Sequence, residues 1–252
     1  RDALFNALSA LERLREKELE AGKGKGEETD TDKRFAEALS FYAATYPNDP
    51  EIPGFLLNQG VTYYDHKIYD PAIKIFGELL TRYPNSKEAQ AAGDRMVDSL
   101  VHAKDFGNVE TWCRKLKTLP AYQSEAQQKK LDGLIVQAEF KQGEALAGKG
   151  DHVGAANAYL RAAREFPKDE RAAKACVNAV VEAKASGELG IAQSAADLAI
   201  KDHAGKPEAA QAIWTIAEAL RGAGLLGEAA AYDEKLVDKY PKDVHARDAG
   251  FN

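Results

Sequence analysis

Two glycine-rich segments carry spacings that could bind a nucleotide. Residues 222–227 satisfy the GxGxxG pattern, which holds a pyrophosphate where a strand leads into a helix. A predicted helix over residues 209–221 precedes the pattern, so we interpret it as a turn between two helices. Residues 143–150 lack one feature of a P-loop, because Gly150 stands where a Ser or Thr must bind magnesium. We interpret Gly148 and Gly150 as a helix end and turn.

Histidine and cysteine show no pattern typical of a metal site or a nucleophile. The five histidines lie far apart in the sequence, and no two have the i, i+4 spacing of metal ligands. They are His66, His102, His152, His203 and His245. The two cysteines, Cys113 and Cys176, fall in different predicted helices, and we expect two buried thiols. We therefore predict no enzyme activity, no metal site and no cofactor.

Composition excludes further classes of function. The formal charge of -6 disfavours nucleic acid, because phosphate binding needs a basic surface. No run approaches the roughly 20 apolar residues of a membrane span, so we expect no span in this chain. The chain is 44% hydrophobic but only 8% aromatic, and much of the apolar share is alanine. That balance favours closely packed helices over sheets.

An aromatic-Pro pair recurs along the chain and marks a repeat. The pairs begin at Tyr46, Tyr83, Phe166 and Tyr240, while Leu119-Pro120 and His203-Ala204 are degenerate versions. The spacings are 37, 36, 47, 37 and 37 residues, so we predict units ending near residues 47, 84, 120, 167, 204 and 241. The unit with about ten extra residues carries them within residues 123–150, where its first helix is predicted to be longer.

Each unit is predicted to contain two helices separated by a short turn. Proline cannot continue a helix and disfavours helical geometry in the residue before it, so the second helix should end at the aromatic-Pro pair. A residue suited to capping follows, and the next first helix should start there. These residues are Asp49, Ser86, Ser124 and Asp169.

The second unit resembles the tetratricopeptide repeat family. Counted from Pro53, it has the family's preferred residues at six positions: Leu56, Gly60, Tyr63, Ala72, Phe76 and Pro84. The fourth unit also matches, whereas the third has Met96 and Asn108 at the small positions and the fifth replaces the aromatics with alanines. The resemblance implies an all-α fold, a right-handed superhelix of about six helical hairpins, and binding to other proteins.

The resemblance also implies a concave groove lined by the first helices, which would bind an extended segment or an amphipathic helix of a partner protein. The side chains placed there are Leu57, Val61, Tyr64, Asp65, Val97, Leu100, Val101, Phe140, Glu144, Val177, Val181, Lys184, Trp214, Glu218 and Arg221. Trp214 fits either a binding anchor or a core position. The lysine and asparagine clamp of chaperone-binding relatives is missing, which disfavours a cochaperone role.

Outside the array over residues 32–241, three segments carry expectations of their own. Residues 1–21 form either the first helix of the first unit or a preceding amphipathic helix. Residues 22–31 are rich in Gly, Lys and acidic residues and are predicted to be a flexible loop. Residues 242–252 are predicted to start a further, truncated helix.

Units near 37 residues that close on Tyr-Pro resemble a subgroup common in bacterial envelope proteins. That subgroup includes the barrel-assembly lipoprotein, the Tol-associated coordinator and repeat proteins of gliding and adhesion machines. We therefore expect a noncatalytic scaffold in the periplasm or cell envelope, with a cytoplasmic scaffold as the alternative. A second hypothesis is a regulatory sensor that binds a short peptide or a cell-wall fragment in the same groove.

Overall fold

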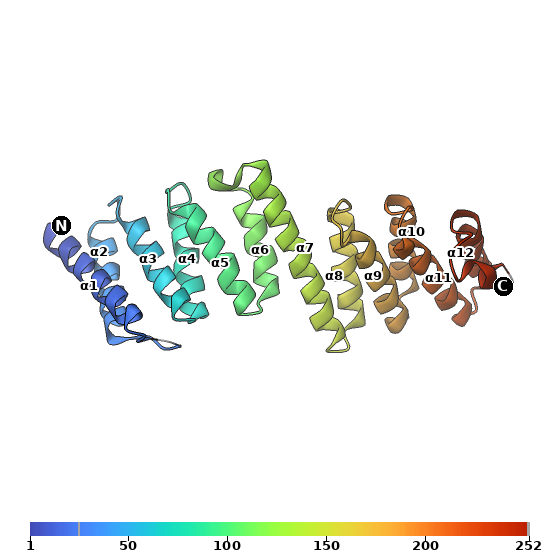
Figure 1. Ribbon diagram of the computed structural model, residues 1–252, viewed down its shortest axis with the longest axis horizontal. Coiled ribbons are helices and arrows are strands. Elements are labelled where there is room, and N and C mark those ends of the chain that lie inside the picture. Colours follow the sequence, from blue (N-terminus) through green and yellow to red (C-terminus); the bar gives the residue numbers. More distant parts are fainter. Residues whose placement is uncertain (25, 251–252) are drawn as a thin grey trace. The chain divides into compact units, whose positions relative to one another are not determined.

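The computed structural model describes residues 1–24 and 26–250, and every regular element in these ranges is helical (Figure 1). The chain divides into two compact units, Arg1–Leu131 and Asp132–Asn252. The first unit contains α1 (Asp2–Glu20), α2 (Asp30–Thr45), α3 (Ile52–Asp65), α4 (Tyr69–Arg82), α5 (Ala89–His102), α6 (Phe106–Leu116), the short 3-10 helix η1 (Pro120–Tyr122) and the start of α7 (Glu125–Ala147). The second contains the rest of α7, α8 (His152–Glu165), α9 (Ala172–Ser186), α10 (Leu189–Asp202), α11 (Pro207–Gly222), α12 (Leu226–Lys239) and α13 (Ala246–Ala249).

Successive helices pair into six hairpins, from α1 with α2 to α11 with α12. This confirms the predicted all-α fold of helical hairpins. α1 packs against α2, and the ring of Phe5 lies 5.5 Å from the ring of Phe55 on α3. Residues 251–252, which belong to the predicted C-terminal helix, lie outside the described residues. None of the helices in the described ranges is both long and apolar enough to span a membrane.

The second helices end where the sequence predicts. The residues that follow the last helical turn of α2, α4, α8, α10 and α12 are Tyr46, Tyr83, Phe166, His203 and Tyr240. Each leaves the helical conformation while its N–H still donates to the carbonyl four residues earlier. Asp49 and Asp169 do not cap the next helices, which begin at Ile52 and Ala172. Their carboxylates instead accept from the N–H two residues later and close the turn before each helix. Ser124 does cap α7, because its hydroxyl accepts from the N–H of Gln127. Ser86 does neither, because its buried hydroxyl has no hydrogen-bond partner.

The third hairpin differs from the others. α6 ends at Leu116, three residues before Leu119, and Tyr122 of η1 turns back onto α5, where its hydroxyl donates to the carbonyl of Gln90 at 2.8 Å. A side chain at Gly93 would place its Cβ into the Tyr122 hydroxyl, so this tyrosine needs glycine opposite it. Tyr122 is 1% exposed and supplies the aromatic group that the degenerate Leu119-Pro120 pair lacks.

A buried ion pair joins the first hairpin. Arg15 Nε of α1 donates to Asp32 Oδ1 of α2 at 2.9 Å, and both side chains are almost completely buried. Asp32 Oδ2 also accepts from the N–H and hydroxyl of Thr29, which completes a capping box at the start of α2. Gly26 N–H donates to the carbonyl of His66 at 2.8 Å. Lys25, within the loop predicted to be flexible, lies outside the described residues, and the mobility of that loop stays a prediction.

The core of the second unit is built mainly from alanine. More than half of the buried residues in its hydrophobic cluster are alanines, most of them on α8 to α11. Small side chains allow helix axes to approach closely. Cys176 lies in this core and Cys113 in that of the first unit, so the prediction of two buried thiols is confirmed. Burial raises the pKa of each thiol to about 12, which keeps both protonated near neutral pH.

Candidate protein-binding surface

The predicted binding residues of α3 lie on one side of that helix. Leu57, Val61 and Tyr64 are half-buried, and Asp65 is exposed. We call the exposed side of the odd-numbered helices the first-helix face, formed in the first unit by α3 and α5 and in the second by α7 from residue 132 onward, α9 and α11.

Tyr64 connects α3 to α5. Its hydroxyl donates to the carboxylate of Asp98, and the guanidinium carbon of Arg95 lies 4.7 Å from the centre of its ring. The ring also makes edge contacts with Tyr69 at 6.0 Å and His102 at 6.2 Å. The hydrogen bond to Asp98 raises the pKa of Tyr64, so the phenol stays neutral. Tyr64 therefore helps to fix the spacing of two first helices and leaves part of its ring exposed.

Two predicted residues of α5 are in the core instead. Val97 is 5% exposed and Leu100 is 1% exposed, so neither offers surface to a partner. α3 and α5 begin 37 residues apart, at Ile52 and Ala89, whereas the aromatic-Pro spacing between these units is 36. An error of one residue rotates a position by about 100° around a helix, and this moved the prediction onto the buried side.

The corrected register identifies residues that the sequence analysis missed. The counterparts of Leu57, Val61, Tyr64 and Asp65 on α5 are Asp94, Asp98, Val101 and His102. All four are half-buried or exposed, and only Val101 was predicted. Alignment of the helix starts would have found the other three.

In the second unit, α9 and α11 bring several predicted residues together. Val181 is 44% exposed, and Lys184 Nζ lies 3.0 Å from a carboxylate oxygen of Glu218 on α11. Arg221 pairs with Asp233 of α12 at 2.5 Å, and its guanidinium carbon lies 5.5 Å from the centre of the Trp214 ring. Val177 is only 6% exposed, because the alanine-rich helices around it pack closely enough to cover it. The contact surface here is Val181 with the Lys184–Glu218 pair.

The remaining predicted residues of the second unit contact other residues of that unit, which cover part of their surface. The ring of Phe140 packs edge-on against Tyr159 at 5.3 Å, and Glu144 pairs with Lys141 at 2.6 Å. Trp214 is half-buried and stacks on His245, with ring centres 4.6 Å apart and planes 6° from parallel. One face of the indole is therefore covered within the unit.

Polar contacts join equivalent helices of neighbouring hairpins, and all but Glu12–Asn58 pair residues 34 to 36 positions apart. On the first helices these contacts are Glu12–Asn58, Tyr64–Asp98, Asp94–Lys130 and Lys184–Glu218. On the second helices they are Thr81–Lys115, Gln193–Glu228 and Asp197–Tyr232. We call these the inter-repeat contacts. They hold neighbouring hairpins in register without using the hydrophobic core.

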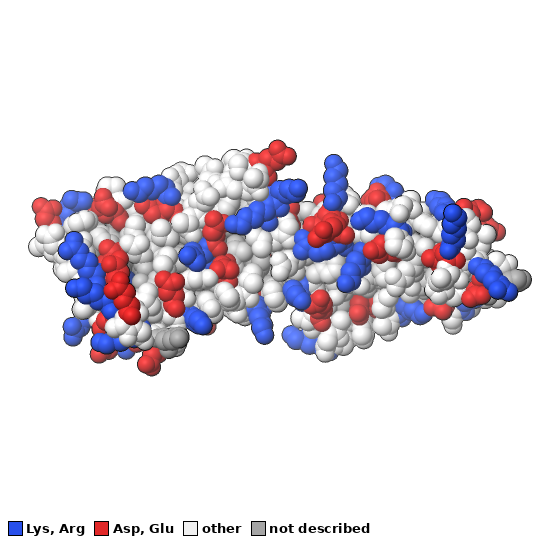
Figure 2. All heavy atoms as spheres, in the orientation of Figure 1, with Lys and Arg blue, Asp and Glu red and all other residues white. Residues whose placement is uncertain are grey.

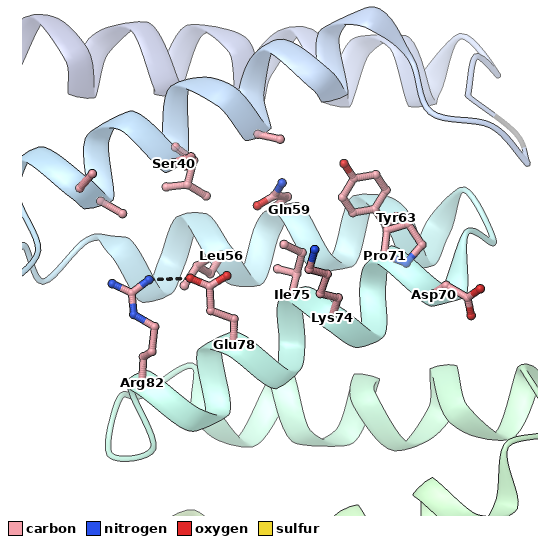
Figure 3. A pocket seen from close by; sticks show the side chains of 14 residues that line it. Ser40, Leu56, Gln59, Tyr63, Asp70, Pro71, Lys74, Ile75, Glu78 and Arg82 are labelled. Atoms are coloured by element: carbon pink, nitrogen blue, oxygen red, sulfur yellow. Dashed lines mark hydrogen bonds and ion pairs between the residues drawn. The ribbon is translucent and has the colours of Figure 1, made fainter.

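A groove of about 790 Å³ lies elsewhere, between α2 and α4 with α3 as its floor (Figure 3). Its floor residues are Leu56, Gln59 and Tyr63, which occupy a different side of α3 from Leu57, Val61 and Tyr64. No residue of the predicted binding set lines it. The family resemblance implies binding residues on the first helices, so this surface was not predicted.

The two glycine-rich segments, residues 143–150 and 222–227, form helix ends and turns between helices. Residues 222–227 join the end of α11 to the start of α12, and Gly224 has a φ of 79°, which confirms the predicted turn. Gly150 likewise has a φ of 80° in the turn after α7. Within the described ranges no group of three or more His, Cys, Asp or Glu side chains is placed to hold a metal ion. Acidic and basic side chains are interspersed on the face shown in Figure 2.

Family models agree with the hairpin geometry. Models described as tetratricopeptide repeat match residues 55–86, 121–170 and 178–244, which together make up more than half of the chain. The chain belongs to the tetratricopeptide repeat family. The matched segments include the hairpins α3/α4, α7/α8 and α11/α12, whereas the irregular third hairpin is not matched.

Several solved tetratricopeptide structures align with most of this chain. The TPR2AB domain of yeast Sti1, in a complex with pHSP90, is 15% identical, covers 98% of this chain and 96% of its own, and has a TM-score of 0.37. A thermophilic TPR protein of Thermus thermophilus is 18% identical over 79% of this chain and 100% of its own, with a TM-score of 0.33. Part of a repeat protein from Cytophaga hutchinsonii is 14% identical over 86% of this chain and 94% of its own, with a TM-score of 0.32.

No curated protein sequence matches the chain. Tetratricopeptide repeats generally mediate protein–protein interactions, so membership in the family points to protein partners.

Proposed function

We propose that this chain is a noncatalytic scaffold of the bacterial cell envelope, which assembles a multiprotein complex by binding a segment of another protein on its first-helix face. Proteins of this repeat family generally act as binding modules. The inter-repeat contacts support the same role, because they fix the spacing of neighbouring first helices before a partner arrives. Such preorganisation lowers the entropic cost of binding.

The observation that carries the proposal is the surface at Val181. An exposed valine lies beside a lysine and a glutamate that already pair across two helices. An apolar contact bordered by polar groups is the usual anatomy of a protein interface. An extended segment or an amphipathic helix can place an apolar side chain on Val181 and polar groups on Lys184 and Glu218.

The envelope location rests on the sequence. Three of the units close on Tyr-Pro, at Tyr46-Pro47, Tyr83-Pro84 and Tyr240-Pro241, and four of the five spacings between successive unit ends are 36 or 37 residues, as in the envelope subgroup.

Site-specific photo-crosslinking in the producing organism tests the proposal. A photoreactive amino acid replaces Val181 in one strain and Val237 in another. Val237 is a matched control, because it is a helical valine of similar exposure, 36%, on α12 outside the first-helix face. We expect the Val181 probe to give discrete protein adducts that the Val237 probe does not. Equal patterns from both probes, or no adduct from either, would contradict binding on this face.

The same strains test the compartment separately. Osmotic shock should release the chain, or leave it with the envelope fraction, while a cytoplasmic marker stays inside the cells. Recovery of the chain with the cytoplasmic marker would reject the envelope location and leave the binding face untouched.

A further inference from the structure

The groove between α2 and α4 provides a second surface with its own chemistry. α2 contributes small residues, chiefly Ala36, Ser40 and Ala43, and α4 contributes Ile75 together with a charged edge. Figure 3 shows Gln59 and Lys74 reaching toward the space between the two helices. The groove lies entirely within the first unit.

The next pair of second helices shows why this groove is open. α4 and α6 begin 37 residues apart, so each side chain of the groove has a counterpart one repeat later. The counterparts of Ser40, Gln59 and Ile75 are Gly77, Met96 and Trp112. A Cβ at Gly77 would lie 3.4 Å from both the methyl group of Met96 and the Trp112 ring, so these side chains pack against α4 at this point.

The smaller side chain of Ile75 leaves more space at the first interval. The hollow between α4 and α6 measures about 570 Å³, against about 790 Å³ between α2 and α4. Isoleucine in place of tryptophan removes the ring that packs between the two walls at the neighbouring interval, and Ser40, although larger than its counterpart Gly77, does not replace that ring. The groove is therefore a specific departure from the packing of the neighbouring repeat.

The α4 edge of the groove alternates in charge along one side of the helix. Asp70, Lys74, Glu78 and Arg82 follow one another at intervals of four residues. Glu78 and Arg82 pair with each other at 2.6 Å. Asp70 and Lys74 form no ion pair with any residue in the described ranges. One acidic and one basic group are thus available to a ligand at the edge of an otherwise apolar groove.

The backbone around the groove favours a helical ligand. Every lining residue lies inside α2, α3 or α4, and the central ones, Leu56, Gln59 and Ile75, have their backbone groups bonded within the helices. An extended peptide would find no backbone partners there, whereas a helix satisfies its own.

We propose that the α2–α4 groove binds one amphipathic helix of a partner protein. Large apolar side chains of that helix enter the space over Leu56 and Ile75. One basic and one acidic residue, four positions apart on the edge beside α4, pair with Asp70 and Lys74. This site is independent of the first-helix face, because it uses the other side of α3.

Fluorescence anisotropy with synthetic helical peptides tests the site. The probe is a labelled peptide of about 14 residues, or roughly four turns, with a leucine stripe and one Lys and one Glu four positions apart beside it. Two comparison peptides carry two Lys or two Glu at these positions. We expect the mixed-charge peptide to bind about threefold more tightly than either like-charged peptide. The double variant Asp70→Lys/Lys74→Asp should instead prefer, by a similar factor, a peptide in which the Lys and the Glu are exchanged.

Two protein variants locate the binding. Ile75→Trp places in the groove the ring that α6 carries at the counterpart position, and it should weaken the mixed-charge peptide at least about tenfold. Val61→Trp, on the other side of α3, should leave that affinity unchanged. Absence of saturable binding to the native chain, equal affinity for all three peptides, or an undiminished affinity in Ile75→Trp would each overturn the proposal. Circular dichroism of Ile75→Trp confirms that it is folded.

Discussion

The two units contain the same kind of helical hairpin but pack it with buried side chains of different size. The largest fully buried side chains of the described residues, such as Tyr42, Phe76 and Tyr122, all lie in the first unit. The second unit buries mainly alanines, and its few large groups include Tyr159 and Ile213. The first unit also carries the buried Arg15–Asp32 pair and the open α2–α4 groove.

This difference shows how packing decides where surface is available. Alanines allow α8 and α10 to contact each other, and they allow α9 and α11 to cover Val177. Bulky side chains hold helices further apart, and the space between them stays filled only where each side chain meets a complementary one. Where the match is incomplete, as at Ile75, a groove results.

The largest expected effect is the loss of stability when the buried ion pair of the first unit is removed. Asp32→Ala leaves the guanidinium of Arg15 buried without its carboxylate, which should cost about 3–5 kcal/mol of the free energy of unfolding. Asp169→Ala is the matched control in the second unit, since the Asp169–Arg171 pair is partly exposed and should contribute about 1 kcal/mol or less. Urea denaturation measures the loss of the free energy of unfolding in each variant. Native-state hydrogen exchange then shows in which unit the backbone amides have lost protection. Equal losses would show that burial does not distinguish the two pairs.

Acid should weaken the same contact. Burial alone would raise the pKa of Asp32, but the hydrogen bonds from Arg15 and Thr29 outweigh it and hold the pKa below its ordinary value. The stabilisation is therefore present above the ordinary aspartate range and disappears as pH falls through the lowered pKa.

A smaller difference in stability should distinguish the alanine core of the second unit from the α2–α4 groove. Ala195→Leu inserts three carbons into the alanine core of the second unit, where the site is 0% exposed, and overpacking should cost about 1–3 kcal/mol. The same substitution at Ala43 points into the α2–α4 groove and should change the free energy of unfolding by less than about 0.5 kcal/mol. Denaturant midpoints of the two variants give the comparison. A costly Ala43→Leu would mean that the groove is closed in solution.

The smallest effect concerns one histidine of the second unit. His203 occupies the position of the repeated aromatic and is 5% exposed, and burial, assisted by Lys206, lowers its pKa. The folded chain therefore favours the neutral ring, and its contribution to stability is lost as pH falls below about 6.5. His203→Phe should flatten this dependence by about 1 kcal/mol or less at pH 5.

Melting temperatures between pH 5 and pH 8 measure the effect of His203→Phe. Tyr240→Phe is the control, because Tyr240 is the equivalent residue of the next repeat and burial raises its pKa away from this range. Parallel curves for the native chain and His203→Phe would contradict the assignment.

Local signals in the sequence predicted the hairpins well. Proline after an aromatic residue ends a helix through backbone geometry alone, so the ends of α2, α4, α8 and α12 could be predicted without knowing the fold. The family resemblance then supplied the pairing of helices. The early end of α6 was not predicted, because it depends on Tyr122 finding space against Gly93 from another helix.

The surface was harder to predict than the fold. Val97 and Leu100 were misplaced by an error of one residue, and Val177 is buried by neighbours whose distance the sequence does not state. The groove depends on pairs that meet across helices. Its signal was present, since Ile75 stands one repeat before Trp112, but it becomes visible only when second helices are aligned at a spacing of 37 residues.

The inter-repeat contacts have a consequence for how this array could change during evolution. They differ in chemistry, since Tyr64 needs a carboxylate one repeat later while the Thr81 hydroxyl accepts from a lysine. The hairpins are therefore not interchangeable modules. Exchanging two of them by recombination would place each donor opposite a mismatched group, so their order along the chain is inherited together with their sequences.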